Sequence, residues 1–343
     1  MAKQPATRPQ LITILERWMV VSGLGEYQLK DVVPAEAGMS SETWLLAAIA
    51  PDGSNRDWVL RIQPRARQVY QDPSIARQFD VIRCLSQVPG LPVPAGVALE
   101  QDADILGAPF FLMERAPGKA PPDGYHTQGL LAEATPAQRE SMWEQGVSLL
   151  ARLHAVDVTP FDFLAWPDGP AGDGIAQELA RWDAYLAWSG VPRLGIYDRA
   201  LRWLDDHRPP AAGTGFAWGD ARPCNILYAD GKATALLDWE TASIGTAETD
   251  LGWWLFYDRM MTDAIGLPRL DGLPDARATI ALWEAASGRR AQAMEWHIVF
   301  AGYRFAMISE RAIRMAIRTG HMPETMAGDG NPAICLLTEL VRS

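Results

Sequence analysis

The sequence is poor in cysteine and holds no long apolar run. Three cysteines, Cys84, Cys224 and Cys335, stand far apart in a chain of 343 residues, which excludes a disulfide framework and a CxxC metal pair. No stretch approaches the roughly 18 apolar residues needed to cross a bilayer. The first ten residues lack the apolar core of a signal peptide. We therefore expect a cytoplasmic protein with no membrane partner.

Lysine is scarce as well, and acidic residues outnumber basic ones. The chain has four lysines, and its net charge at pH 7 is -11. Nucleic-acid binding depends on lysine and arginine side chains that neutralise phosphates, so no DNA or RNA partner is expected. With 48% hydrophobic and 21% charged residues, the composition is that of an ordinary globular protein. The length favours two parts with separate apolar cores.

The sequence pattern changes from strand-rich to helix-rich along the chain. The elements expected first are a helix over 11–21, a hairpin of 43–50 and 57–63 around the turn formers PDGSNR, a helix over 75–85, and a strand within 107–118 that ends in a Pro/Gly break. Later helices are expected over 137–154, 175–187 and about 275–319. This order predicts an α+β fold. Its N-terminal part, 1–115, holds a helix and an antiparallel sheet, and its C-terminal part, 116–343, is mostly helical.

One segment, FAWGDARPCNILYADGKATALLDWE at 216–240, concentrates side-chain oxygens. Asp230 and Gly231 are strong turn formers, so NILY and ATALL form a hairpin whose open end brings Asn225 and Asp238 together. Carboxylate and carboxamide oxygens suit Mg²⁺, and the further carboxylate of Asp220 can accept a hydroxyl proton. The structural alternative is a turn cap, a loop contact and a helix start at these three positions.

WGDARPCN resembles the catalytic loop of aminoglycoside phosphotransferases and their choline-kinase-like relatives, and LLDWE resembles their metal-binding motif. GMSSETWLL, DWVLRIQP and FFLMERAPG are similar to the phosphate loop, third strand and hinge of the same family. The resemblance implies a protein-kinase-like two-lobed fold, with a small nucleotide-binding lobe and a larger helical lobe. It also implies an enzyme that uses ATP and Mg²⁺ to phosphorylate a hydroxyl of a small molecule.

The resemblance assigns roles by position. Asp220 would accept or orient the substrate hydroxyl, Arg222 would grip phosphate oxygens, and Asn225 and Asp238 would hold Mg²⁺. The nucleotide contacts that it implies are Gly38, Ser40, Ser41, Arg61, Met113, Glu114 and Ala116. For Arg222, a solvated loop position or an ion pair with Glu240 is the alternative, and for Arg61 an exposed strand position.

Three positions depart from the family pattern. Trp218 stands where the family usually has His, Arg61 replaces the strand Lys, and Gln78 replaces the helix Glu, with Asp80 as another carboxylate near that place. These departures keep a second function open, a catalytically degenerate kinase-like module that binds a nucleotide or metabolite. Asp250 matches a family Asp that braces the catalytic loop, and helix capping is its alternative role.

The residues after 280 bear on the acceptor. They hold six acids against seven arginines, whereas a polycationic aminoglycoside needs acidic surroundings. An aminoglycoside is therefore not the predicted acceptor. Arg304, Arg311, Arg314 and Arg318 recur at helical spacing. We expect a solvated helix face, with recognition of an anionic or neutral hydroxylated acceptor as the alternative. The sequence leaves the oligomeric state open.

Overall fold

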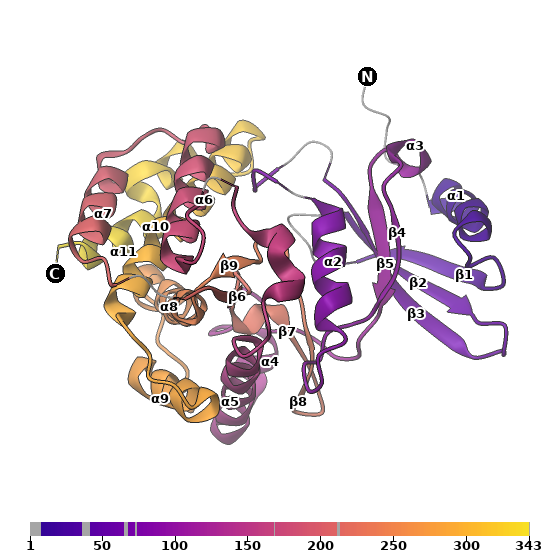
Figure 1. Ribbon diagram of the computed structural model, residues 1–343, viewed down its shortest axis with the longest axis horizontal. Coiled ribbons are helices and arrows are strands. Elements are labelled where there is room, and N and C mark those ends of the chain that lie inside the picture. The colour runs from indigo at the N-terminus through magenta and orange to yellow at the C-terminus, as the bar shows by residue number, and fades with distance from the viewer. Residues whose placement is uncertain are drawn as a thin grey trace. The chain divides into compact units, whose positions relative to one another are not determined.

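The computed structural model describes residues 8–35, 42–64, 68–72, 74–167, 169–210 and 213–342. The chain divides into two compact units (Figure 1). The first draws on residues 1–68, 72–89 and 93–116, and the second on 69–71, 90–92 and 117–343. Among the described helices, none combines the length and the apolar character required to cross a bilayer.

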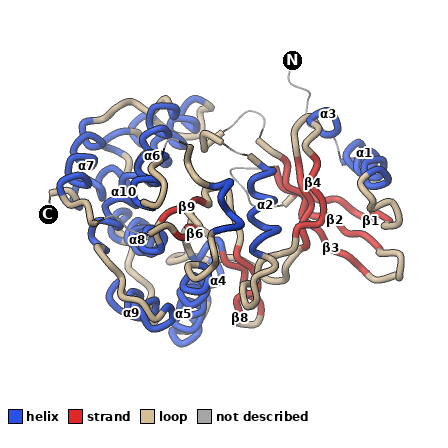
Figure 2. The backbone as a smooth tube through the Cα atoms, viewed as in Figure 1, coloured by secondary structure: helices blue, strands red, loops and turns tan. Residues whose placement is uncertain are grey.

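The first unit is a five-stranded antiparallel sheet, in the order β1-β2-β3-β5-β4, with accompanying helices (Figure 2). Its elements are α1 (Arg8–Val21), β1 (Gln28–Pro34), β2 (Glu42–Ile49), β3 (Asn55–Ile62), α2 (Ile75–Leu85), β4 (Gly96–Glu100), α3 (Ala103–Leu106) and β5 (Phe110–Glu114). The predicted helices and the β2–β3 hairpin are confirmed. Strand β1 was not predicted, because its short apolar stretch has no clear alternation.

The two faces of this sheet pack against different helices. Trp58 and Leu60 of β3 belong to the same buried cluster as Leu15 and Trp18 of α1. On β5, Phe111 meets Phe79 of α2, with ring centroids 5.7 Å apart. Because successive strand residues point to opposite faces, Val59 and Arg61 lie on the face that α2 covers.

The second unit is mainly helical (Figure 2). Its helices are α4 (Gly129–Glu133), α5 (Pro136–Leu153), α6 (Gly174–Ser189), α7 (Gly195–Asp206), α8 (Ala247–Met260), α9 (Ala276–Ser287), α10 (Met294–Arg318) and α11 (Pro332–Leu340). Short 3₁₀ turns occupy Thr159–Leu164, Pro223–Asn225, Asp263–Ile265, Glu324–Met326 and Gly328–Gly330. Helices α5 and α6 were predicted, and the helices expected over about 275–319 are α9 and α10. Helix α8 is buried all round from Ala247 to Asp258 and packs along α10, so it lacks the one-sided periodicity by which surface helices are recognised.

Two short strand pairs frame the segment that the sequence singled out. They are β6 (Gly215–Ala217) with β9 (Ser243–Gly245), and β7 (Ile226–Ala229) with β8 (Lys232–Leu236). Asp230 and Gly231 join β7 to β8 with φ of 49° and 71°, which is the left-handed backbone of a type I′ hairpin turn. The predicted hairpin is confirmed. Two segments are therefore held at both ends by paired strands. One connects β6 to β7 and the other connects β8 to β9.

Candidate active site

Asp220 lies in the segment between β6 and β7, which we call the catalytic loop (residues 218–225). Its carboxylate is buried and accepts three hydrogen bonds. Trp253 Nε1 donates to Oδ1 at 2.9 Å, while Asn225 Nδ2 and Arg222 Nε donate to Oδ2 at 2.8 and 3.0 Å. Asn225 Nδ2 also donates to the Asp220 carbonyl. Three donors from two elements fix the orientation of this carboxylate.

Burial raises the pKa of Asp220, and the nearby charge of Asp238 raises it further, whereas Arg222 and the hydrogen bonds from Asn225 and Trp253 lower it. The net direction is upward from the usual value for aspartate. A carboxylate whose pKa is raised binds a proton more readily than an ordinary aspartate. That property suits a group that accepts or orients the proton of a substrate hydroxyl.

Asn225 and Asp238 lie at the open end of the β7–β8 hairpin. Leu237 N donates to Asn225 O at 2.9 Å, so the backbone next to Asp238 is bonded directly to Asn225. Asp238 has a φ of 62°, a left-handed conformation that is uncommon for a residue other than glycine. Trp218 Nε1 donates to Leu237 O at 2.9 Å. The indole thus ties the catalytic loop to the same turn, and this contact explains how the loop accommodates Trp in place of His.

The donor set is compatible with Mg²⁺. Asn225 uses its amide nitrogen on Asp220, which leaves the carboxamide oxygen as the atom available to a cation. Asp238 supplies a carboxylate, and its charge acts on both Asp220 and the half-buried Tyr70. In the part of the chain that the structure describes, no cluster of three or more His, Cys, Asp or Glu side chains could hold a metal by itself. A site with two protein oxygens, completed by water and phosphate, is the kind that Mg²⁺ occupies.

Asp250, in the first turn of α8, braces the catalytic loop. Its fully buried carboxylate accepts hydrogen bonds from Trp218 N at 2.6 Å and Gly219 N at 2.8 Å. His154 Nδ1 accepts a hydrogen bond from Trp283 Nε1, so the ring proton resides on Nε2, which donates to Asp250 at 3.0 Å. Asp250 therefore braces the loop as predicted, whereas it does not cap α8, whose N-cap residue is Thr246.

Arg222 is held by partners rather than solvated. Besides Asp220, its guanidinium contacts Asp123 Oδ1 at 2.8 Å and Tyr257 OH at 3.1 Å, and it lies over the Tyr257 ring. The alternatives of a solvated position or a pairing with Glu240 are therefore replaced by an ion pair with Asp220 and Asp123. A contact between Arg222 and phosphate stays a prediction.

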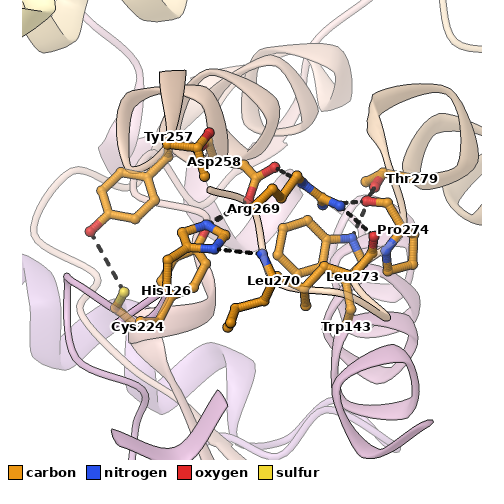
Figure 3. A network of polar contacts seen from close by, with 12 residues as sticks. His126, Trp143, Cys224, Tyr257, Asp258, Arg269, Leu270, Leu273, Pro274 and Thr279 are labelled. Carbon is orange, nitrogen blue, oxygen red and sulfur yellow. Dashed lines mark hydrogen bonds and ion pairs between the residues drawn. The ribbon is translucent and has the colours of Figure 1, made fainter. Parts of the chain in front are cut away.

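A second polar network joins His126 to Asp258, Arg269 and Leu270 (Figure 3). Leu270 N donates to His126 Nδ1, so His126 Nε2 carries the proton and faces Asp258 Oδ1 at 3.3 Å. Arg269 Nε donates to Asp258 Oδ2 at 2.7 Å. Burial alone would raise the pKa of Asp258, but His126 and Arg269 outweigh it and the pKa is lowered. The ionised carboxylate anchors Tyr125 and His126 to α8.

The one cysteine of the catalytic loop is not a nucleophile. Cys224 Sγ donates to Pro122 O at 3.3 Å and lies 3.6 Å from Tyr257 OH (Figure 3). Burial raises the pKa of the thiol to about 12. Because the thiolate is the reactive form, this side chain stays protonated at neutral pH, and it serves the packing of the loop.

The expected nucleotide contacts lie in the first unit. Gly38, Ser40 and Ser41 are outside the described residues. Met113 and Glu114 end β5, and Ala116 follows them; their contact with a nucleotide stays a prediction. Arg61 is half-buried on β3, and Gln78 of α2, on the same side of the sheet, is buried with no partner for its Oε1 among the described residues. Asp80 pairs with Arg83.

Sequence reasoning missed two residues of the site and misplaced a third. Trp253 is buried, and its indole nitrogen donates to Asp220. Asp123 carried no pattern that could have identified it. Arg304 was expected on a solvated helix face. That expectation is wrong, because Arg304 is 1% exposed and donates to Gly219 O.

The model of the phosphotransferase enzyme family matches residues 31–288. The chain belongs to this family. Its fold is that of the protein-kinase-like phosphotransferases, as predicted. A Ralstonia eutropha protein assigned as an aminoglycoside phosphotransferase superposes with a TM-score of 0.71 and 23% identity, covering 96% of this chain and 95% of the other. The hygromycin B complex of aminoglycoside phosphotransferase APH(4)-Ia gives a TM-score of 0.61 at 13% identity, covering 96% and 98%.

The curated relatives of this chain are longer proteins. Acyl-CoA dehydrogenase family member 10 of Mus musculus is 27% identical over 225 residues, which cover 65% of this chain and 20% of that protein. Acyl-CoA dehydrogenase family member 11 of Homo sapiens is 24% identical over 297 residues, which cover 84% of this chain and 36% of that protein. The chain spans at most about a third of these relatives.

The pH dependence of a phosphotransferase reaction tests the Asp220–Arg222 pair. In Arg222→Gln, the cation that lowers the pKa of Asp220 is lost, so less of the carboxylate is ionised at a given pH. The acidic limb of kcat/KM is then expected to move to higher pH. Rate profiles from pH 5 to 9 would measure it, with Arg222→Lys as the control that keeps the charge. An unmoved limb in Arg222→Gln would show that Asp220 does not limit the rate.

Proposed function

We propose that this protein is an ATP- and Mg²⁺-dependent phosphotransferase that moves the γ-phosphate to a hydroxyl of a small molecule. The observation that carries the proposal is the Asp220 carboxylate, held by three donors beside Asn225 and Asp238. A cytoplasmic location, where ATP is abundant, stays part of the same prediction.

In this mechanism the chain's own groups position the reactants. Asp220 orients the acceptor hydroxyl and takes its proton as the oxygen attacks phosphorus. Asn225 and Asp238 would hold Mg²⁺ through oxygen atoms, and the cation would supply neutralisation of phosphate charge. Asp250 and Trp218 keep the catalytic loop and the turn at Asp238 in register. Because phosphoryl transfer needs little covalent help, this positioning is the main contribution expected from the protein.

The acceptor is proposed not to be a polycationic aminoglycoside. The excess of arginine over acid after residue 280 disfavours binding a cation. The curated relatives are named for acyl-CoA chemistry, so hydroxylated acyl thioesters of coenzyme A are the first acceptors to test. A screen with γ-labelled ATP would compare them with free hydroxy acids, sugars, choline, hygromycin B and a macrolide. Transfer confined to the antibiotics would contradict the proposal.

Nucleotide binding is expected to depend on the metal. At a free ATP concentration about 100 times Kd, ligand binding stabilises the folded state by about 2.7 kcal/mol, which for a chain of this size is a rise in Tm of several degrees. We expect that rise with Mg²⁺, a much smaller one with EDTA, and no effect of Mg²⁺ in Asp238→Asn. Differential scanning fluorimetry measures all three.

The competing function is a degenerate kinase-like module that binds a nucleotide without turning it over. Arg61 and Gln78 in place of Lys and Glu favour it, because an arginine and a neutral amide cannot reproduce the usual ion pair. If ATP stabilises the protein but no phosphoryl transfer or ATP hydrolysis is detected, the result supports the degenerate module. Slow hydrolysis that is lost in Asp220→Ala would select the enzyme.

A further inference from the structure

Arg304 of α10 is a buried cation beneath the catalytic loop. Its guanidinium carbon lies 4.6 Å from the ring centroid of Trp182 and 4.6 Å from that of Trp253. Nη2 donates to the carbonyl of Gly219 at 2.7 Å. Nε and Nη1 have no hydrogen-bond partner among the described residues. The guanidinium therefore makes one directed contact, and that contact is to the residue before Asp220.

This arrangement is a poor way to stabilise a fold. Removing a guanidinium from water is costly unless its donors are satisfied, and burial lowers the pKa of Arg304. The carboxylate oxygen Glu178 Oε2 is 4.0 Å from Nη1, beyond hydrogen-bond distance. A buried polar group with unmet donors calls for an explanation other than stability.

Two routes connect Arg304 to Asp220. The first is the hydrogen bond to Gly219 O, which fixes the peptide that leads into Asp220. The second is Trp253, whose ring lies beside the guanidinium and whose Nε1 donates to Asp220 Oδ1. Asp250 binds the amides of Trp218 and Gly219 in the same stretch. Gly219 is thus held at its N–H by an anion and at its carbonyl by a cation.

We propose that Arg304 is a positioning residue for phosphoryl transfer, which sets the orientation of the Asp220 carboxylate through the Gly219 carbonyl and the Trp253 indole. The expected effect of Arg304 on the reaction rate rests on the proposed function. The expected effect of Arg304 on the conformation of the catalytic loop is independent of that function. Removing the guanidinium leaves Asp220 in place but lets its carboxylate turn, so kcat falls while nucleotide binding is retained.

Arg311 offers a matched control on the same helix. Two turns after Arg304, its guanidinium lies over the Trp188 ring at 4.1 Å and Nη1 donates to the carbonyl of Ser189. The two arginines thus share a helix, a stacked indole and a bond to a backbone carbonyl. They differ in that Ser189 ends α6, whereas Gly219 belongs to the catalytic loop. Comparing Arg304→Met with Arg311→Met separates positioning from a general loss of packing.

The experiment measures Mg²⁺-dependent ATP hydrolysis and amide hydrogen exchange in both variants. In Arg304→Met we expect kcat to fall by about 10- to 100-fold, since small misplacements of a catalytic group have effects of this order, with the KM for ATP within about threefold. Peptides covering 216–222 should exchange faster. Arg311→Met should leave kcat and this exchange within about threefold of the parent. Arg304→Lys, which keeps a cation, should recover part of kcat.

Equal losses of kcat in the two Met variants would overturn the proposal, and so would unchanged exchange over 216–222 in Arg304→Met. If the parent protein neither hydrolyses ATP nor transfers phosphate, the proposed function fails, and exchange alone decides whether Arg304 holds the loop. If Arg304→Met does not fold, Arg304→Lys provides the same comparison, with faster loop exchange and lower kcat as the supporting result.

Discussion

Replacing Asp220 with asparagine is expected to lower kcat for phosphoryl transfer by about 10²- to 10⁴-fold, the range that a positioned general base contributes. The amide has nearly the shape of the carboxylate, but it cannot take the acceptor proton and cannot accept from three donors at once. The KM for ATP should change little, because Asp220 faces the acceptor in the proposed mechanism. Steady-state rates with the acceptor found in the screen, or ATP hydrolysis in its absence, give the measurement.

The fold of this variant should survive. Burial raises the pKa of Asp220, so the ionised carboxylate destabilises the native state at neutral pH, and removing its charge offsets the hydrogen bonds that are lost. Asp230→Asn is the matched control, because Asp230 is exposed in the β7–β8 turn, where asparagine also tolerates a positive φ. A kcat in Asp220→Asn equal to that of Asp230→Asn would refute a role of Asp220 in catalysis.

Gly219→Ala is expected to destabilise the protein by about 3 kcal/mol or more and to abolish activity. Gly219 has a φ of 84°, and a Cβ built there would lie 2.2 Å from the carbonyl oxygen of Thr241. The backbone conformation contributes about 1–2 kcal/mol and the clash adds the cost of overpacking. The loop can relieve the clash only by moving away from Thr241, which breaks the bonds of Gly219 to Asp250 and Arg304.

Gly231→Ala is the control for Gly219→Ala, because it has the same conformational cost without the steric clash. Gly231 has a φ of 71°, yet apart from its two chain neighbours no residue that the structure describes has an atom within 4 Å of the added Cβ. We therefore expect a loss of about 1–2 kcal/mol with activity retained. Urea denaturation of both variants measures the difference. Equal losses of stability in the two variants would mean that the clash with Thr241 does not contribute to the free energy of unfolding.

The hairpin and its turn could be read from the sequence because both are local. Asp230 and Gly231 favour a type I′ turn whatever surrounds them, and the helix at 75–85 follows from its periodicity. The same locality places Asn225 and Asp238 at adjoining ends of two strands. The protein-kinase-like fold followed from a resemblance of motifs in their order, which the family match and the solved structures bear out.

The surroundings of Asp220 could not be read in this way, because they come from distant parts of the chain. Trp253 lies 33 positions away, and Arg304 lies 85 positions from Gly219. No spacing rule links such residues. For Arg304, the usual exposure of charged side chains predicted a solvated position, and helical periodicity showed which residues share a face without showing what the face meets.

The distance along the chain between Gly219 and Arg304 also bears on how the protein is made. The loop between β6 and β7 leaves the ribosome before its anchors on α8 and α10 exist, and a contact separated by 85 positions requires closing a long loop, which slows folding. The hydrogen-bonded arrangement around Asp220 therefore forms only after most of the chain has been synthesised. A nascent chain that ends before α10 can already hold the β7–β8 hairpin and still lack a functional centre.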